Sequence, residues 1–71
     1  MICDAYFSTY EVMLASPDKS VRELASNELL HFYRQNENRY NEILSIPKTD
    51  WTEHHFKLVS RMNQIKTLLK L

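Results

Sequence analysis

The sequence of 71 residues contains no glycine, and this absence restricts both its fold and its chemistry. Phosphate-binding loops, dinucleotide-binding turns and the sharp turns that carry a nucleophilic serine need glycine, because the backbone there takes positive φ or lies against a ligand. Nucleotide-binding and hydrolase motifs of these kinds are therefore excluded. Two prolines, Pro17 and Pro47, are the strong breakers, and they divide the chain into three segments with helical periodicity.

This division predicts three helices, over about residues 3–15, 17–45 and 50–70, in a single domain of residues 1–71. The second helix begins at SPDKS, where the first serine can cap the backbone, proline suits the first helical position and aspartate complements the helix dipole. In the third, Asp50 and Glu53 are predicted to form a capping box. We therefore expect an all-α fold, either a small open three-helix bundle or a helical hairpin with an N-terminal helical arm.

The stretch RQNENR, residues 34–39, places six polar residues in the middle of the second predicted helix. Apolar residues on both sides of it share one face, and steps of three or four residues connect them through Asn36 without a phase slip. They are Val21, Leu24, Ala25, Leu29, Phe32, Tyr33, Tyr40, Ile43 and Leu44. A turn would usually reset this phase and favour glycine or proline. The pattern predicts one continuous helix; the alternative is a break with Asn36 or Asn38 as a left-handed cap.

The first and third predicted helices carry more apolar surface than three short elements can bury. One stripe of the first helix contains Ile2, Tyr6, Tyr10 and Met13, whereas Phe7, Val12 and Leu14 lie elsewhere on it. The third helix has a heptad-like seam of Trp51, His55, Leu58, Met62, Ile65 and Leu69, widened by Phe56, Val59 and Leu68. Some of these side chains should remain exposed in a monomer and favour an interface; the alternative is that they complete a small core. The candidates are Tyr6, Phe7, Tyr10, Met13, Phe56 and Val59.

The charges of the chain cancel, with nine basic and nine acidic residues, so no global attraction to nucleic acid or to an anionic membrane is expected. After Glu53 every charged residue is basic: Lys57, Arg61, Lys66 and Lys70. The helix dipole favours cations at this end, which explains them as a solvated, stabilising face. The alternative is a stripe that contacts nucleic acid.

The sequence offers little material for catalysis or metal binding. His54 and His55 are adjacent on a helix and diverge by about 100°, so they cannot chelate one metal, and His31 and Cys3 add no zinc-like spacing. A nucleophile built from Cys3 and a histidine is the one catalytic arrangement that can be written. We therefore expect a non-enzymatic protein with no metal, no cofactor and no small-molecule substrate.

The single cysteine cannot form an internal disulfide, which indicates a reducing cytoplasm. No apolar run approaches the roughly 18 residues of a membrane span, and no basic segment followed by an apolar stretch marks a secretion signal. A cytoplasmic location without membrane contact is therefore expected.

The sequences ELASNELLHFYRQNENRYNEIL and IPKTDW resemble the central helix and the proline-to-tryptophan ending of the Hha/YmoA family. These small bacterial proteins bind the oligomerising domain of the nucleoid protein H-NS and modulate gene silencing. The matching positions are Glu23, Leu24, Asn27, Glu28, Leu29, Phe32, Tyr33, Arg39, Glu42, Ile46, Pro47 and Trp51. The resemblance implies a regulator of gene expression in which Glu37 stands where the family has a partner-contacting acid, with Arg39 close to it in sequence.

The layout of a short first helix, a long second helix and a third that starts with an aromatic residue after a proline-containing turn is similar to another family. Its members are the small co-chaperones that help hold type III secretion needle subunits in the bacterial cytoplasm, where an amphipathic hairpin pairs with a helical-repeat partner. This likeness implies an adaptor that uses exposed apolar surface and the seam of the third helix. We therefore expect a protein that binds another protein or, as a homo-oligomeric module, itself. The predicted partner-binding residues are Tyr6, Phe7, Tyr10, Met13, Glu37, Arg39, Phe56 and Val59.

Overall fold

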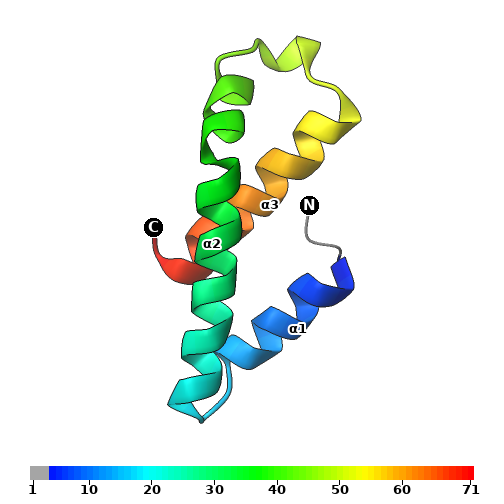
Figure 1. The fold of residues 1–71 in the computed structure, drawn as a ribbon. Helices are drawn as coiled ribbons and strands as arrows, with labels where there is room; N and C mark the ends of the chain where they lie inside the picture. Colours follow the sequence, from blue (N-terminus) through cyan, green and yellow to red (C-terminus); the bar gives the residue numbers. More distant parts are fainter. Residues whose placement is uncertain (1–3) are drawn as a thin grey trace. The chain divides into compact units, whose positions relative to one another are not determined.

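The structure, a computed structural model, describes residues 4–71, and this part of the chain is all-α, as the sequence predicts (Figure 1). Its elements are the α-helices α1 (Asp4–Leu14), α2 (Lys19–Leu44) and α3 (Glu53–Leu69) and the short 3-10 helix η1 (Lys48–Asp50). No strand occurs among the residues described. The predicted start of the first helix at residue 3, together with Ile2 and Cys3, lies outside them.

The chain divides into two compact units that share α2. The first unit ends at Phe32 and contains α1 and the N-terminal half of α2. The second unit, Tyr33–Leu71, contains the C-terminal half of α2, η1 and α3. Each unit therefore consists of two helical segments joined by a short connection.

The helix α2 is continuous through the polar stretch RQNENR. Its 26 residues give a length of about 39 Å at 1.5 Å per residue. Asn36 is half-buried whereas Gln35 and Glu37 are exposed, so Asn36 lies on the apolar face as predicted. The prediction of a continuous helix is confirmed, and the alternative break at Asn36 or Asn38 is wrong. The helix persists because no glycine or proline interrupts it and the apolar phase is the same on both sides.

Buried side chains follow the apolar stripes predicted for the second and third helices. The core residues are Phe7 in α1, Ala25, Leu29, Phe32, Tyr40 and Ile43 in α2, and Leu58, Val59, Met62 and Ile65 in α3. Leu24 and Leu44, predicted on the same face of α2, are about half exposed. Each of them precedes or follows a buried residue, so its side chain points about 100° away from that neighbour. The predicted apolar face of α2 therefore has the correct phase, but it wrongly includes Leu24 and Leu44, which lie at its exposed edges.

Three side-chain hydrogen bonds stabilise the second unit. The Trp51 Nε1–H group donates to the carbonyl oxygens of both Ile43 and Ile46, at 3.0 Å each, which ties the indole ring to the last turn of α2 and to the connection that follows it. The Tyr40 hydroxyl donates to Asn63 Oδ1 at 2.7 Å, and a buried phenol needs such a partner. The Tyr40–Asn63 bond joins residues 23 positions apart, and it sets the register between α3 and the C-terminal part of α2.

The predicted capping box of Asp50 and Glu53 is wrong, because α3 begins later than expected. Pro47 starts the 3-10 turn η1, and Asp50 is the last residue of that turn. The N-cap of α3 is Thr52, whose Oγ1 accepts from the His55 N–H at 3.3 Å, while His55 Nδ1 accepts from the Thr52 N–H at 3.2 Å. The capping box is therefore present but built from threonine and histidine.

The start of α2 also differs from the prediction in its capping residue. Asp18 Oδ1 accepts from the Ser20 N–H at 2.8 Å, and Ser16 Oγ accepts from the Asp18 N–H at 3.1 Å. The Arg22 guanidinium donates to the Ser16 carbonyl at 2.7 Å. Asp18 thus satisfies a free N–H of the first turn, and Ser16 stabilises the connection that precedes it.

Candidate functional site

An exposed aromatic surface lies at the start of α3 in the second unit. The rings of Trp51 and Phe56 meet edge to face, with centroids 5.1 Å apart and an interplanar angle of 67°. Lys48 Nζ lies 5.8 Å from the centroid of the Trp51 ring. Phe56 is nevertheless 45% exposed. We call Lys48, Trp51 and Phe56 the aromatic cluster.

Contacts within the second unit fix the positions of the two rings of the aromatic cluster. The indole N–H already has two carbonyl partners, so the Trp51 ring is positioned by the end of α2. The T-shaped contact is a preferred geometry for an aromatic pair, and it restricts Phe56 in turn. Leu44 at the end of α2 and Pro47 in the connection are also exposed. Apolar groups are therefore exposed to solvent in and beside the connection between α2 and α3.

The candidates predicted on the first helix are placed differently from one another. Tyr6 is strongly exposed, and Tyr10 and Met13 are half-buried along the same stripe of α1. Phe7, which the sequence placed off this stripe, is the buried residue of α1, with only 3% of its surface exposed. A partner cannot contact Phe7 without rearrangement of the helix, so this residue is removed from the candidate surface. Val12, not predicted as a candidate, is strongly exposed.

The two apolar candidates on α3, Phe56 and Val59, also differ in their exposure to solvent. Phe56 belongs to the aromatic cluster, but Val59, three residues later, is only 7% exposed and forms part of the core. The seam residues Leu58, Met62 and Ile65 are buried as well. Val59 and these three seam residues are therefore not available to a partner in the folded protein.

The charged candidates Glu37 and Arg39 lie on α2 and are both exposed. Neither forms an ion pair within residues 4–71, in contrast with Glu23 and Glu53, which pair with lysines at 3.8 and 3.3 Å. Two residues apart on a helix correspond to a rotation of about 200°, so the two side chains leave α2 on opposite sides. One flat partner surface could therefore contact Glu37 or Arg39, but not both.

The basic residues of α3 do not form a single stripe. Lys57 pairs with Glu53, and Arg61 donates to Gln64 Oε1 at 3.1 Å on the same side of the helix. Lys66 and Lys70 lie nine or more residues beyond Lys57, a rotation of about 180° or more, which places them on the other side. The arrangement lacks the continuous basic track that a nucleic-acid backbone would follow.

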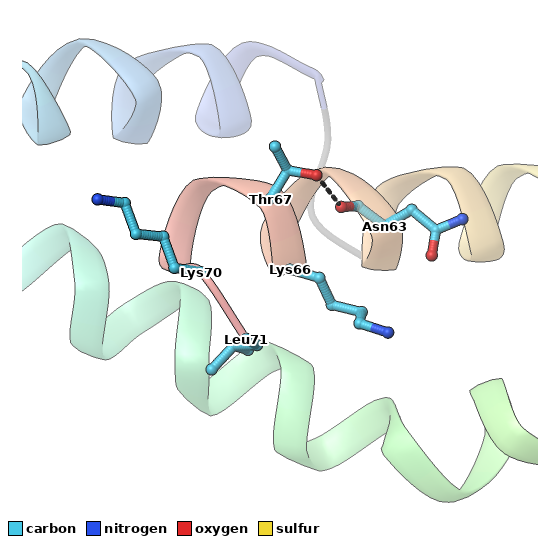
Figure 2. Close-up of a pocket in the computed structure, with 5 residues that line it drawn as sticks. All are labelled: Asn63, Lys66, Thr67, Lys70 and Leu71. Carbon is cyan, nitrogen blue, oxygen red and sulfur yellow. Dashed lines mark hydrogen bonds between the residues drawn. The ribbon is translucent and has the colours of Figure 1, made fainter.

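Lys66 and Lys70 line a shallow hollow at the C-terminal end of α3, together with Asn63, Thr67 and Leu71. Figure 2 shows Thr67 bonded to the Asn63 carbonyl and the two lysine side chains directed to opposite sides, with Leu71 between them. Lys66 Nζ lies 5.9 Å from the centroid of the buried Tyr40 ring. We call these five residues the basic hollow; none of them is acidic.

The backbone of Lys70 has φ 57° and ψ 45°, the left-handed conformation that ends α3. The Leu71 N–H donates to the Lys66 carbonyl at 2.9 Å, which closes the helix end in a Schellman-type arrangement. Glycine, or sometimes asparagine, usually occupies this position, because a Cβ atom is unfavourable there. Lysine at position 70 therefore makes the protein less stable than glycine would.

Lys70→Gly is expected to raise the free energy of unfolding by about 1 kcal/mol, because glycine removes the steric cost of the left-handed backbone. Urea unfolding followed by circular dichroism measures this change. Lys66→Gly is the matched control, and it should lower the stability by about 1 kcal/mol because Lys66 has helical backbone inside α3. A stability of Lys70→Gly equal to or below the original would contradict the assigned backbone.

Other kinds of site are not found within the described part of the chain. No group of three or more histidine, cysteine, aspartate or glutamate residues among residues 4–71 could hold a metal ion. No helix in this range has the length and apolar character needed to cross a membrane. Comparison with family models, curated proteins and solved structures gave no significant match to this chain. Function is therefore inferred from the surfaces described above.

Proposed function

We propose that this protein acts by binding another protein through the aromatic cluster, and that it catalyses no reaction. The observation that carries the proposal is that Phe56 remains 45% exposed while its ring is held edge-on against Trp51. Large aromatic side chains that are rigid before binding make effective interface anchors, because little conformational entropy is lost when a partner covers them. Phe56 is not part of the core, to which α3 contributes Leu58, Val59, Met62 and Ile65.

The proposed mode of action is that of a small helical adaptor in the cytoplasm. The layout likeness to needle co-chaperones supports an apolar hairpin surface that a helical partner covers. The seam of α3 is not proposed as the contact, because Leu58, Met62 and Ile65 are buried. The contact surface is instead centred on the connection between α2 and α3. Trp51 lies in this connection, Leu44 ends α2 and Phe56 lies in the first turn of α3.

The test is quantitative capture from a host lysate with three tagged chains: the original, Phe56→Asp and Leu24→Asp. Leu24 is the matched control, because it is 54% exposed but lies outside the aromatic cluster. We expect Phe56→Asp to recover at least about tenfold less of the partner, since a carboxylate cannot be buried in an apolar contact, while Leu24→Asp recovers it fully. Unchanged helicity of both variants excludes unfolding as the cause.

Equal recovery of the partner by Phe56→Asp would contradict the proposal. Recovery of the bait alone, together with a multimer in light scattering that Phe56→Asp dissociates, would identify the partner as a second copy. That result would support the homo-oligomeric module instead of an adaptor between different proteins.

A second candidate function is regulation of a nucleoid protein, as the resemblance to the Hha/YmoA family implies. It is supported by Glu37, which is exposed and without an ion pair within residues 4–71. Because Arg39 leaves α2 on the opposite side, only one of the two charges is expected to contact the partner.

Charge reversal distinguishes this candidate from the first. Glu37→Arg should weaken binding to the oligomerising domain of a nucleoid protein by about tenfold or more, and Arg39→Glu should change it much less. Glu28→Arg, at another exposed position of α2, serves as the control for net charge. Affinity that survives both reversals at positions 37 and 39 would exclude this candidate.

A further inference from the structure

We infer that the basic hollow binds an acidic segment of a protein, in which two carboxylates flank an apolar side chain. The inference rests on the proposed function and deepens it, since it names the chemistry of one part of the partner. The hollow supplies two ammonium groups from Lys66 and Lys70, a side-chain amide from Asn63 and the exposed apolar side chain of Leu71.

The two lysines of the hollow differ from Lys19 and Lys57 in having no acidic partner among residues 4–71. Lys19 and Lys57 each pair with a glutamate one turn away on the same helix. Lys66 and Lys70 form no ion pair within residues 4–71. The second unit as a whole carries seven basic and four acidic residues, a net charge of +3. The field around the hollow therefore favours a negatively charged ligand.

The directions of the Lys66 and Lys70 side chains indicate which kind of anion the basic hollow binds. In Figure 2 the ammonium groups of Lys66 and Lys70 lie on opposite sides of the hollow, and Leu71 lies between them. In this arrangement the two ammonium groups are too spread to share one small anion such as phosphate. They fit two separate carboxylates on a segment that crosses the hollow, with an apolar side chain between them over Leu71. Lys66 is held on its side by the Tyr40 ring, at 5.9 Å.

The backbone at Lys70 supplies an independent observation. This residue takes the left-handed conformation, which glycine would adopt without steric cost. Strained backbone at a residue that lines a surface hollow points to a function for its side chain. Nucleic acid is a poorer occupant than a protein segment, because the remaining basic residues of α3 lie on its other side and no exposed aromatic side chain lines the hollow for base stacking.

The experiment is an NMR titration of the 15N-labelled full chain with a synthetic peptide containing the sequence Glu-Ala-Leu-Ala-Glu. We expect saturable shifts of the backbone amides of residues 63–71, and binding about tenfold weaker in roughly 0.5 M salt than in dilute buffer. Lys70→Glu should abolish the shifts, and Lys66→Gln should weaken them at least severalfold. Lys57→Glu is the matched control, because Lys57 lies on the other side of α3, and it should bind normally.

Several outcomes would overturn the inference. These are no shifts at all, equal binding of the peptide with glutamine in place of both glutamates, and tighter binding of inorganic phosphate or of a short DNA duplex at the same amides. Phe56→Asp should bind the peptide as the original chain does. If the peptide does not bind while capture of a partner still depends on Phe56, this inference fails and the proposed function stands.

Discussion

Leu29→Ala is expected to lower the free energy of unfolding by about 2–5 kcal/mol. Leu29 is fully buried, with 0% of its surface exposed. Its truncation removes apolar contact and leaves a cavity that the surrounding side chains fill only in part. A chain of this size has a total stability of roughly 4–10 kcal/mol, so the variant should unfold at a much lower temperature. Thermal unfolding followed by circular dichroism measures the change.

Leu24→Ala is the control for this prediction, because it makes the same chemical change five residues earlier in the same helix. Leu24 is 54% exposed, and its truncation should cost no more than about 0.5 kcal/mol. The difference between the two variants therefore reports the burial of Leu29 and not the helix propensity of alanine. Equal stabilities for the two variants would show that the apolar face of α2 is assigned wrongly.

Asn38→Pro is expected to lower the free energy of unfolding by about 3 kcal/mol or more. Asn38 is exposed and lies inside α2, so its side chain contributes little to packing. Proline removes one hydrogen bond of the helix, and its ring clashes with the carbonyl of the preceding turn. Asn38→Ala, the control, should be neutral or slightly stabilising because alanine is the better helix former. Chemical unfolding of both variants measures the two effects.

A third substitution at residue 38 distinguishes a continuous helix from a helix break at RQNENR. The two alternatives predict changes in stability of opposite sign. In a continuous helix, Asn38→Gly destabilises by a few tenths of a kcal/mol, since glycine is the poorer helix former. At a left-handed helix cap the same change would stabilise the protein, because glycine adopts that backbone without a Cβ penalty. A stabilising Asn38→Gly, or an Asn38→Pro variant with full stability, would show that α2 is interrupted.

The class of the helices and the places where they are interrupted could be predicted because they depend on local properties of the chain. The absence of glycine and the positions of Pro17 and Pro47 restrict the breaks to two places. Asn36 could be assigned to the inner face because apolar residues on both sides share one phase. This shared phase predicts a continuous α2, because a turn at RQNENR would usually have reset it.

The capping residues could not be predicted correctly because their choice depends on a 3-10 turn. Pro47 begins η1, and this turn uses Asp50, the residue that looked like the cap of the third helix. Thr52 then becomes the cap, and His55 takes the place that glutamate usually fills. The signal was present as threonine followed three residues later by a polar side chain, but the acidic pair competed with it.

Burial in the first helix could not be predicted because its apolar residues point in several directions. Tyr6 and Phe7 are adjacent and similar in size, yet Tyr6 is exposed and Phe7 is buried. Periodicity within one helix cannot choose between two apolar sides, since tertiary packing decides which side is covered. The same limit explains Val59, which the sequence offered as a candidate for an interface and the fold uses in its core.

The aromatic cluster was only partly visible in the sequence. Phe56 was predicted as a partner-binding residue, whereas Trp51 was assigned to the seam of the third helix. The structure shows that Trp51 bonds to the end of α2 and supports Phe56 from one side. The exposed lining of the basic hollow depends on the left-handed backbone of Lys70, for which a lysine gives no sequence signal.

The central claim, that a partner covers the aromatic cluster, is tested most directly through Trp51, because it is the single tryptophan of the chain. Its fluorescence reports on the cluster without any label. On addition of the purified partner we expect a shift of Trp51 emission to shorter wavelength and a several-fold loss of quenching by iodide, since a covered indole is shielded from water and ions. Binding of the partner with unchanged emission and unchanged quenching would contradict the claim.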